Sequence, residues 1–91
     1  MWTVFEQKSV VKGIKKIPIE VLRRYEAWKR IVELEGPKGL KMIKGFHDEV
    51  LKGNKWRGFR SSRFGIQCHV IYKLGDGLLE VYVFEINPHD Y

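Results

Sequence analysis

The chain has 91 residues, which is the length of one small domain, and 44% of them are hydrophobic, which is enough for a single core. Seventeen Lys and Arg against eleven Asp and Glu give a net charge of +6, which favours a polyanionic or an acidic partner. No apolar run approaches the ~20 residues of a membrane span, and the first residues lack a signal-peptide pattern, so we expect a cytoplasmic protein. The single cysteine, Cys68, can form no intrachain disulfide, so the fold must depend on packing.

The first third of the chain predicts one strand followed by two helices. Residues 2–7 have a short β-type pattern, and apolar residues recur at helical spacing over 9–17. Pro18 suits the first position of a second helix, and Gly36-Pro37 suits its end. The predicted apolar stripe of this helix consists of Leu22, Tyr25, Trp28, Ile31 or Val32, and Leu34.

The remaining two thirds predict a loop followed by a sheet. Four glycines interrupt residues 36–55, so we expect a loop there, with at most one helical turn over 40–43. Residues 58–63, 67–74 and 78–86 are typical of three antiparallel strands, and Gly75-Asp76-Gly77 joins the last two as a hairpin. The last strand is apolar on both faces, which indicates an interior position in the sheet.

These elements predict a single α+β domain over residues 1–91. It would contain a small antiparallel sheet of about four strands, with the two N-terminal helices packed on one face. The opposite face would carry Arg60, Arg63 and either Cys68 or His69, together with the C-terminal tail. This second, basic face is the candidate site.

Basic residues are concentrated near that face. No acidic residue occurs between Leu51 and Gly75, and Trp56 and Phe59 interleave with the cations, a combination typical of RNA binding. A solvated strand edge that uses charge to prevent aggregation is the alternative explanation. The expected RNA-binding residues are Lys52, Lys55, Arg57 and Arg60.

The same region contains the groups needed to cleave RNA without a metal. Attack by a ribose 2′-OH on its own phosphodiester needs a base, an acid and cations that stabilise the phosphorane. Candidate groups are Glu49, His69 or His89 for proton transfer, Arg60 and Arg63 as cations, and Tyr91 to orient or protonate a phosphate oxygen or to stack on a base. An ordinary surface histidine, and an ion pair between Glu49 and Lys52, are the simpler alternatives.

A metal site is a competing interpretation of several residues. Their spacing matches no familiar ligand pattern, and the surrounding cations would repel a divalent ion, so we expect neither a metal nor a cofactor. The residues concerned are His47, Asp48, Cys68, His69, His89 and Asp90. For Cys68 we expect a small buried or half-buried side chain and not a nucleophile.

Four local segments, taken together, resemble one known family. They are the Phe-His-Asp-Glu-Val-Leu-Lys-Gly loop at 46–53, the Gly-Phe-Arg-Ser-Ser-Arg strand at 58–63, Val-Ile-Tyr at 70–72, and the His- and Tyr-bearing tail at 86–91. Their order over essentially the whole chain resembles the RelE/ParE superfamily of bacterial toxins from type II toxin–antitoxin systems, and within it the RelE- and HigB-like members.

The resemblance implies a ribosome-dependent endoribonuclease that cuts mRNA in the A site, with the 2′-OH as nucleophile and no metal. By position, Glu49 matches the loop glutamate proposed as general base, and Arg63 matches the arginine that holds the scissile phosphate. His89 and Tyr91 match the tail residues used as acid, base or stacking group, and Lys52 belongs to the basic rim. The implied partners are a cognate antitoxin protein, the ribosome and mRNA, with no membrane.

One position departs from the family pattern. Most relatives have a phosphate-binding arginine immediately before the Val-Ile-Tyr strand, where this chain has His69. Either His69 takes that role, or Arg60 on the neighbouring strand does.

Two other functions fit the same fold and charge. One is the gyrase-inhibiting, ParE-like branch of the superfamily, against which Glu49, His69, His89 and Tyr91 argue. The other is a non-catalytic basic module that binds RNA with salt-dependent affinity.

Overall fold

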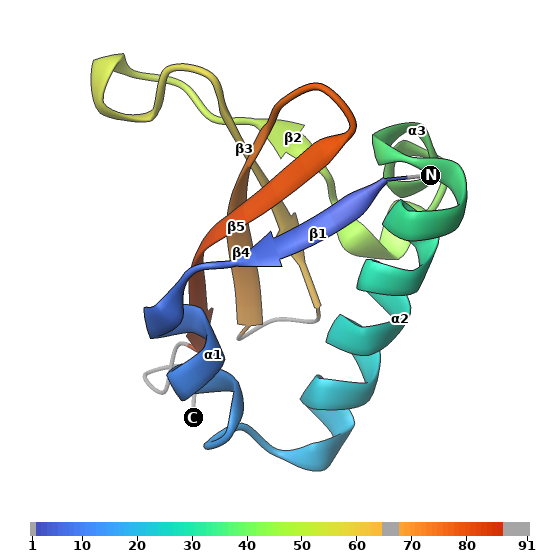
Figure 1. The fold of residues 1–91 in the computed structure, drawn as a ribbon, viewed down its shortest axis with the longest axis vertical. Coiled ribbons are helices and arrows are strands. Elements are labelled where there is room, and N and C mark those ends of the chain that lie inside the picture. The colour runs from blue at the N-terminus through green and yellow to red at the C-terminus, as the bar shows by residue number, and fades with distance from the viewer. Residues whose placement is uncertain (1, 65–67, 87–91) are drawn as a thin grey trace.

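The computed structural model describes residues 2–64 and 68–86 as a sheet with helices packed against it (Figure 1). The strands are β1 (Thr3–Glu6), β2 (Glu49–Val50), β3 (Phe59–Arg63), β4 (Cys68–Leu74) and β5 (Leu78–Ile86). The helices are α1 (Lys8–Ile14), α2 (Ile19–Glu35) and α3 (Pro37–Lys41), with the 3₁₀ turns η1 (Lys44–Phe46) and η2 (Asn54–Trp56) in the loop before β3. The α+β class is therefore confirmed.

The sheet differs from the prediction in strand number and direction. It has five strands in the order β1-β5-β4-β3-β2, and β1 runs parallel to β5 while the other neighbours are antiparallel. The expectation of about four antiparallel strands is wrong because β2 has only two residues, too few to show a period, and local pattern carries no information on the direction of β1. β5 does lie in the interior of the sheet, as its two apolar faces predicted.

The predicted hairpin between the last two strands is confirmed. The backbone N–H of Gly75 donates to the carbonyl of Leu78 at 2.7 Å, and Gly77 has a φ of 69°. A side chain is disfavoured at that positive φ, so glycine suits the turn.

Two glycines control how α2 ends and how the next helix packs. Gly36 ends α2 with a φ of 74°, and a Cβ on it would lie 2.7 Å from Nε1 of Trp2. The segment after it forms α3, five residues long, where only a turn over 40–43 was expected. Gly39, read from sequence as a breaker, instead permits close packing, because a Cβ there would lie 2.8 Å from atoms of Ile31 and Glu35.

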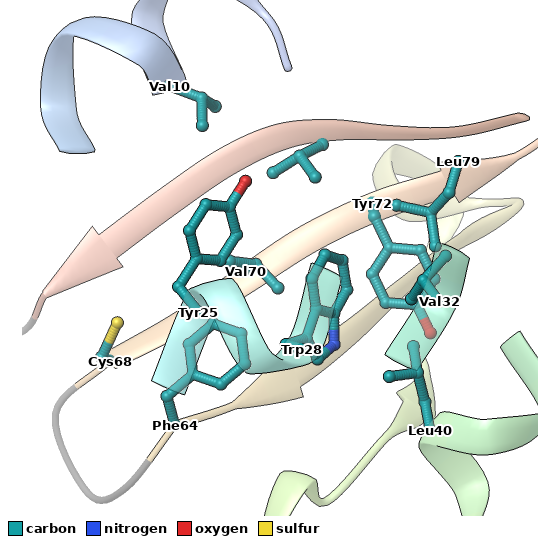
Figure 2. Close-up of a cluster of buried hydrophobic side chains, with 11 residues drawn as sticks. Val10, Tyr25, Trp28, Val32, Leu40, Phe64, Cys68, Val70, Tyr72 and Leu79 are labelled. Atoms are coloured by element: carbon teal, nitrogen blue, oxygen red, sulfur yellow. The ribbon is translucent and has the colours of Figure 1, made fainter. Parts of the chain in front are cut away.

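The core lies between the helices and one face of the sheet (Figure 2). Trp28 of α2 is fully buried and stacks against Tyr25, with ring centroids 5.8 Å apart, and it meets the ring of Tyr72 edge-on at 5.5 Å. Val10 of α1 belongs to the same cluster, so α1 and α2 cover the same face of the sheet. The predicted stripe is confirmed at Tyr25, Trp28 and Val32, whereas Leu34 is exposed.

A polar contact fixes β1 to α2 beside this core. The Tyr25 hydroxyl donates to the Glu6 carboxylate at 2.6 Å, and Nζ of Lys29 lies 3.3 Å from the same carboxylate oxygen. Burial, followed by the bond to Glu6, raises the pKa of Tyr25 far above its usual value.

Within the described residues, no helix combines the length and the apolar character that crossing a bilayer requires.

Candidate functional site: the far face of the sheet

Alternation along the strands divides the sheet residues between two faces. Ser62, Val70 and Tyr72 are fully buried on the face that contacts the helices. Since successive side chains of a strand point to opposite faces, their neighbours point away from the helices. We call this second surface the far face, defined by the register of Glu49, Phe59, Ser61, Arg63, His69, Ile71, Lys73 and Glu80 and by the contact of Tyr82 with Phe59.

Three predicted site residues come together on the far face. Arg63 of β3 is the direct antiparallel partner of His69 of β4, a relation that places Cβ atoms ~5 Å apart. Glu49 pairs with Ser61, two residues before Arg63, so Glu49 and Arg63 are diagonal neighbours, roughly 7–8 Å apart. The structure therefore groups a carboxylate, a guanidinium and an imidazole from three adjacent strands.

Of the two residues left open for the far face, Cys68 and His69, the structure places His69 there. Cys68 points into the core, where it is 3% exposed, and burial raises the pKa of its thiol to about 12. The expectation that Cys68 is a small buried side chain is confirmed, and the open alternative that placed it on the far face is wrong.

Arg60 does not lie where the sequence predicted. It pairs with Tyr72, a core-face residue, and its Nη2 lies 2.6 Å from Oδ2 of Asp48 while its Nε donates to the Tyr72 hydroxyl at 3.2 Å. Burial acts to lower the pKa of Arg60, but the bonds to Asp48 and Tyr72 outweigh it and the pKa is raised. The expectation that Arg60 occupies the far face is wrong, because the parity of β3 separates it from Arg63 and Asp48 neutralises it.

Asp48 is the residue that sequence reasoning missed. The sequence offered Asp48 only as part of the family-like loop and as a candidate metal ligand. Its side chain is in fact fully buried and accepts hydrogen bonds from Ser62 at 2.8 Å and from the Tyr72 hydroxyl, in addition to Arg60. Burial and then the bond to Asp48 raise the pKa of Tyr72. The only sequence signal was an acidic pair followed by an apolar residue, which in a strand places the two carboxylates on opposite faces.

The backbone conformation just before Asp48 explains how its side chain comes to lie on the core face. η1 ends at His47, the one non-glycine residue with positive φ among those described, in the left-handed region at 45°. That turn redirects the chain from the 3₁₀ turn into β2, so Asp48 enters the core face and Glu49 follows on the other side.

The three remaining predicted RNA-binding residues lie in the loop between β2 and β3, which extends away from the sheet (Figure 1). Lys52, Lys55 and Arg57 are all exposed, and Nζ of Lys55 lies 5.3 Å from the centroid of the Trp56 ring. Glu49 and Lys52, both described, form no ion pair, so that simpler explanation of Glu49 finds no support.

Other predicted residues fall outside this part of the chain. His89, Asp90 and Tyr91 lie beyond residue 86 and outside the described residues. Within 2–64 and 68–86, no three His, Cys, Asp or Glu side chains gather in a way that could hold a metal ion.

The far face can bind an anion and accept a proton at one place. Arg63 supplies a permanent charge and donors for a phosphate, and the His69 imidazole beside it offers a further hydrogen-bonding group. Glu49, exposed and diagonal to Arg63, can accept a proton from a hydroxyl bound between them.

Comparison with known proteins shows which solved structures share the fold on which this site lies. No protein-family model matches the sequence, and no curated protein shows a significant match. Among solved structures, the chain is similar to the archaeal RelE–RelB complex from Pyrococcus horikoshii OT3, with 23% identity, 96% of each chain covered and a TM-score of 0.73. It is also similar to the YoeB–YefM complex from Staphylococcus aureus, with 12% identity, 96% of this chain and 98% of that chain covered, and a TM-score of 0.73.

A third similar structure is the toxin–antitoxin complex DinJ–YafQ from E. coli, with 21% identity, 93% of this chain and 91% of that chain covered, and a TM-score of 0.63. These likenesses extend over nearly the whole chain. The protein therefore has the fold of the RelE/ParE superfamily of toxins, as the sequence motifs indicated.

Proposed function

We propose that this chain is the toxin of a type II toxin–antitoxin system and acts as a metal-independent, ribosome-dependent mRNA endoribonuclease in the cytoplasm. The observation that carries the proposal is the grouping of Glu49, Arg63 and His69 on one face of a RelE-like sheet. A surface that only bound RNA would need cations, but it would not need a carboxylate placed diagonally to the phosphate-binding arginine.

In this proposal the ribose 2′-OH attacks the adjacent phosphorus atom and the 5′-oxygen leaves. Glu49 takes the hydroxyl proton, and Arg63 holds the non-bridging oxygens, whose negative charge grows in the phosphorane. His69 would contact the phosphate beside Arg63, at the position where the resemblance places an arginine. The expected acid for the leaving oxygen is His89, with Tyr91 orienting the phosphate or stacking on a base.

The loop between β2 and β3, which we call the basic loop, supports the same function. Lys52, Lys55 and Arg57 are exposed on a loop that extends away from the sheet (Figure 1), and they would contact the phosphates of mRNA or ribosomal RNA. Arg60 is left out of this contact set because Asp48 already neutralises it.

A cognate antitoxin is the proposed protein partner. The similar structures include complexes with YefM, RelB and DinJ, and a net charge of +6 would favour an acidic segment of such a partner.

The test compares growth and mRNA cleavage after induced expression. Wild type should arrest growth and leave mRNA cut at codon positions in primer extension, and Glu49→Ala combined with His89→Ala should abolish both effects. Growth arrest that persists in the double variant would overturn the nuclease assignment. Growth arrest accompanied by inhibition of DNA supercoiling by gyrase would instead favour the ParE-like alternative. Salt-dependent RNA binding without any cleaved product would favour the non-catalytic module.

A further inference from the structure

Three aromatic side chains form a continuous row at one end of the far face. The ring centroids of Trp56 and Phe59 are 5.6 Å apart, and those of Phe59 and Tyr82 are 5.1 Å apart, both edge-to-face. All three side chains are only half-buried. We call Trp56, Phe59 and Tyr82 the aromatic row.

A bulge in β5 accounts for the third member of the row. The pairing shifts from Ile71 with Val83 to Tyr72 with Val81, which leaves Tyr82 as the extra residue. A bulge of this kind re-aims a side chain, and here the Tyr82 ring meets Phe59 across the intervening strand β4. The row therefore spans the width of three strands.

Two lysines lie over the row. Nζ of Lys55 is 5.3 Å from the Trp56 ring, and Nζ of Lys73 is 5.7 Å from the Phe59 ring. Glu80 is the cross-strand partner of Lys73 and the nearest acidic neighbour by register, but its carboxylate accepts a bond from Gln7, on β5's other side. The row thus has half-buried rings with one cation over its first ring, Trp56, and one over its middle ring, Phe59.

The row is aligned with the proposed catalytic group. Phe59 and Arg63 are both on the far face of β3, four residues apart, which corresponds to roughly 13 Å at ~3.3 Å per residue. A strand of RNA whose phosphate is bound at Arg63 would therefore place a neighbouring nucleotide over the aromatic row.

We propose that the aromatic row is a stacking subsite for an unpaired base of single-stranded RNA, with Lys55 and Lys73 contacting the flanking phosphates. This subsite rests on the proposed function for its substrate class, RNA, but it requires one further property of that RNA. The RNA must carry a base at the subsite, whereas Arg63 and the basic loop would bind a bare sugar-phosphate chain equally well.

Another exposed aromatic residue shows why the row is distinctive. Phe5 of β1 is 50% exposed and is paired with Glu80, and no described cation lies over its ring. Phe5 therefore provides a matched control, because it offers an exposed ring on the same sheet without a cation beside it.

The experiment measures binding of the full chain to two short 2′-O-methyl oligoribonucleotides, which have no free 2′-OH and are not cleaved. One carries all its bases and the other has a central run of abasic sites. Because stacking contributes ~1–3 kcal/mol per base, wild type should prefer the first by roughly 5- to 150-fold in fluorescence anisotropy. Trp56→Leu should remove most of this preference, whereas Trp56→Phe and Phe5→Leu should keep it.

Salt dependence separates stacking from charge. Trp56→Leu should leave the slope of log affinity against log salt unchanged, and Lys73→Ala should reduce it by about one. Equal affinity of wild type for the two oligonucleotides would overturn the subsite, as would an unchanged preference in Trp56→Leu. Retained preference in a protein that never cleaves mRNA would support the subsite and reject the proposed function.

Discussion

Asp48 and Glu49 are consecutive in the chain, yet they belong to opposite faces of the sheet. The Asp48 carboxylate is completely buried against Arg60 on the helix side, and Glu49 is exposed and paired with Ser61 on the far face. Because β2 has only two residues, the three bonds to Asp48 are the main side-chain anchor that fixes Glu49 beside Arg63.

The first prediction concerns that anchor. Asp48→Asn keeps the shape of the side chain but leaves Arg60 without its counter-charge, and breaking a buried pair is costly. We expect the free energy of unfolding to fall by about 2–4 kcal/mol in urea denaturation, and cleavage to fall more than the loss of folded protein explains. Asp76→Asn, in the exposed hairpin turn, should change stability by less than about 0.5 kcal/mol. Equal effects of the two variants would contradict the anchoring role.

The second prediction concerns Arg63 and His69. Arg63 is exposed and has no described ion pair, so Arg63→Ala should leave the unfolding midpoint unchanged while lowering the cleavage rate roughly 100- to 1000-fold. His69→Arg should preserve activity, because a guanidinium at that position can also donate hydrogen bonds to the phosphate. Arg30→Ala, an exposed position on α2, is the control for loss of charge. Equal cleavage rates of Arg63→Ala and Arg30→Ala would exclude phosphate binding at Arg63.

The third prediction compares two glycines. Gly36→Ala must adopt a positive φ and displace the Trp2 indole, so we expect it to destabilise the fold by about 2–4 kcal/mol. Gly13→Ala, within α1 and with nothing within 4 Å of the new Cβ, should instead stabilise by about 0.5–1 kcal/mol. Thermal unfolding of both variants measures the two changes in stability. A Gly36→Ala protein as stable as wild type would contradict the close packing of Trp2 against Gly36.

The fourth prediction concerns alkaline pH. Burial raises the folded-state pKa of Tyr25, Tyr72 and Cys68 above the usual values of 10.0 for tyrosine and 9.0 for cysteine. Above about pH 9 the unfolded chain therefore loses protons that the folded chain retains, and stability must fall as pH rises. Each such group contributes up to ~1.4 kcal/mol per pH unit once it titrates in the unfolded chain.

Urea denaturation between pH 8 and 11 measures this slope. Cys68→Ala should remove only the part of the slope that begins near pH 9, since the tyrosines titrate later. Stability that stays constant up to pH 11 would contradict the burial of all three groups.

Features that depend on local pattern could be predicted from the sequence. The spacing of Tyr25, Trp28 and Val32 indicated α2, and Gly75-Asp76-Gly77 indicated the last hairpin, because both signals arise within one element. The residue types of 58–63 and 67–74 indicated two antiparallel strands, and the structure adds the register that pairs Arg63 with His69.

Features that depend on tertiary contacts could not be predicted from the sequence. The parallel direction of β1 is decided by where α1 and α2 return the chain, and Gly39 acts through its contact with Ile31. Arg60 and Arg63 look alike in sequence, and only the register of β3 assigns one to Asp48 and the other to the far face.

The most direct test of the nuclease account is a single 2′-deoxy substitution in the codon that is cut on the ribosome. We predict that unmodified mRNA gives a 5′ fragment ending in a 2′,3′-cyclic phosphate, and that removal of the attacking 2′-hydroxyl abolishes cleavage at that position. Cleavage that continues at the deoxy-substituted nucleotide would show that water or another group is the nucleophile, and would contradict the proposed chemistry at Glu49 and Arg63.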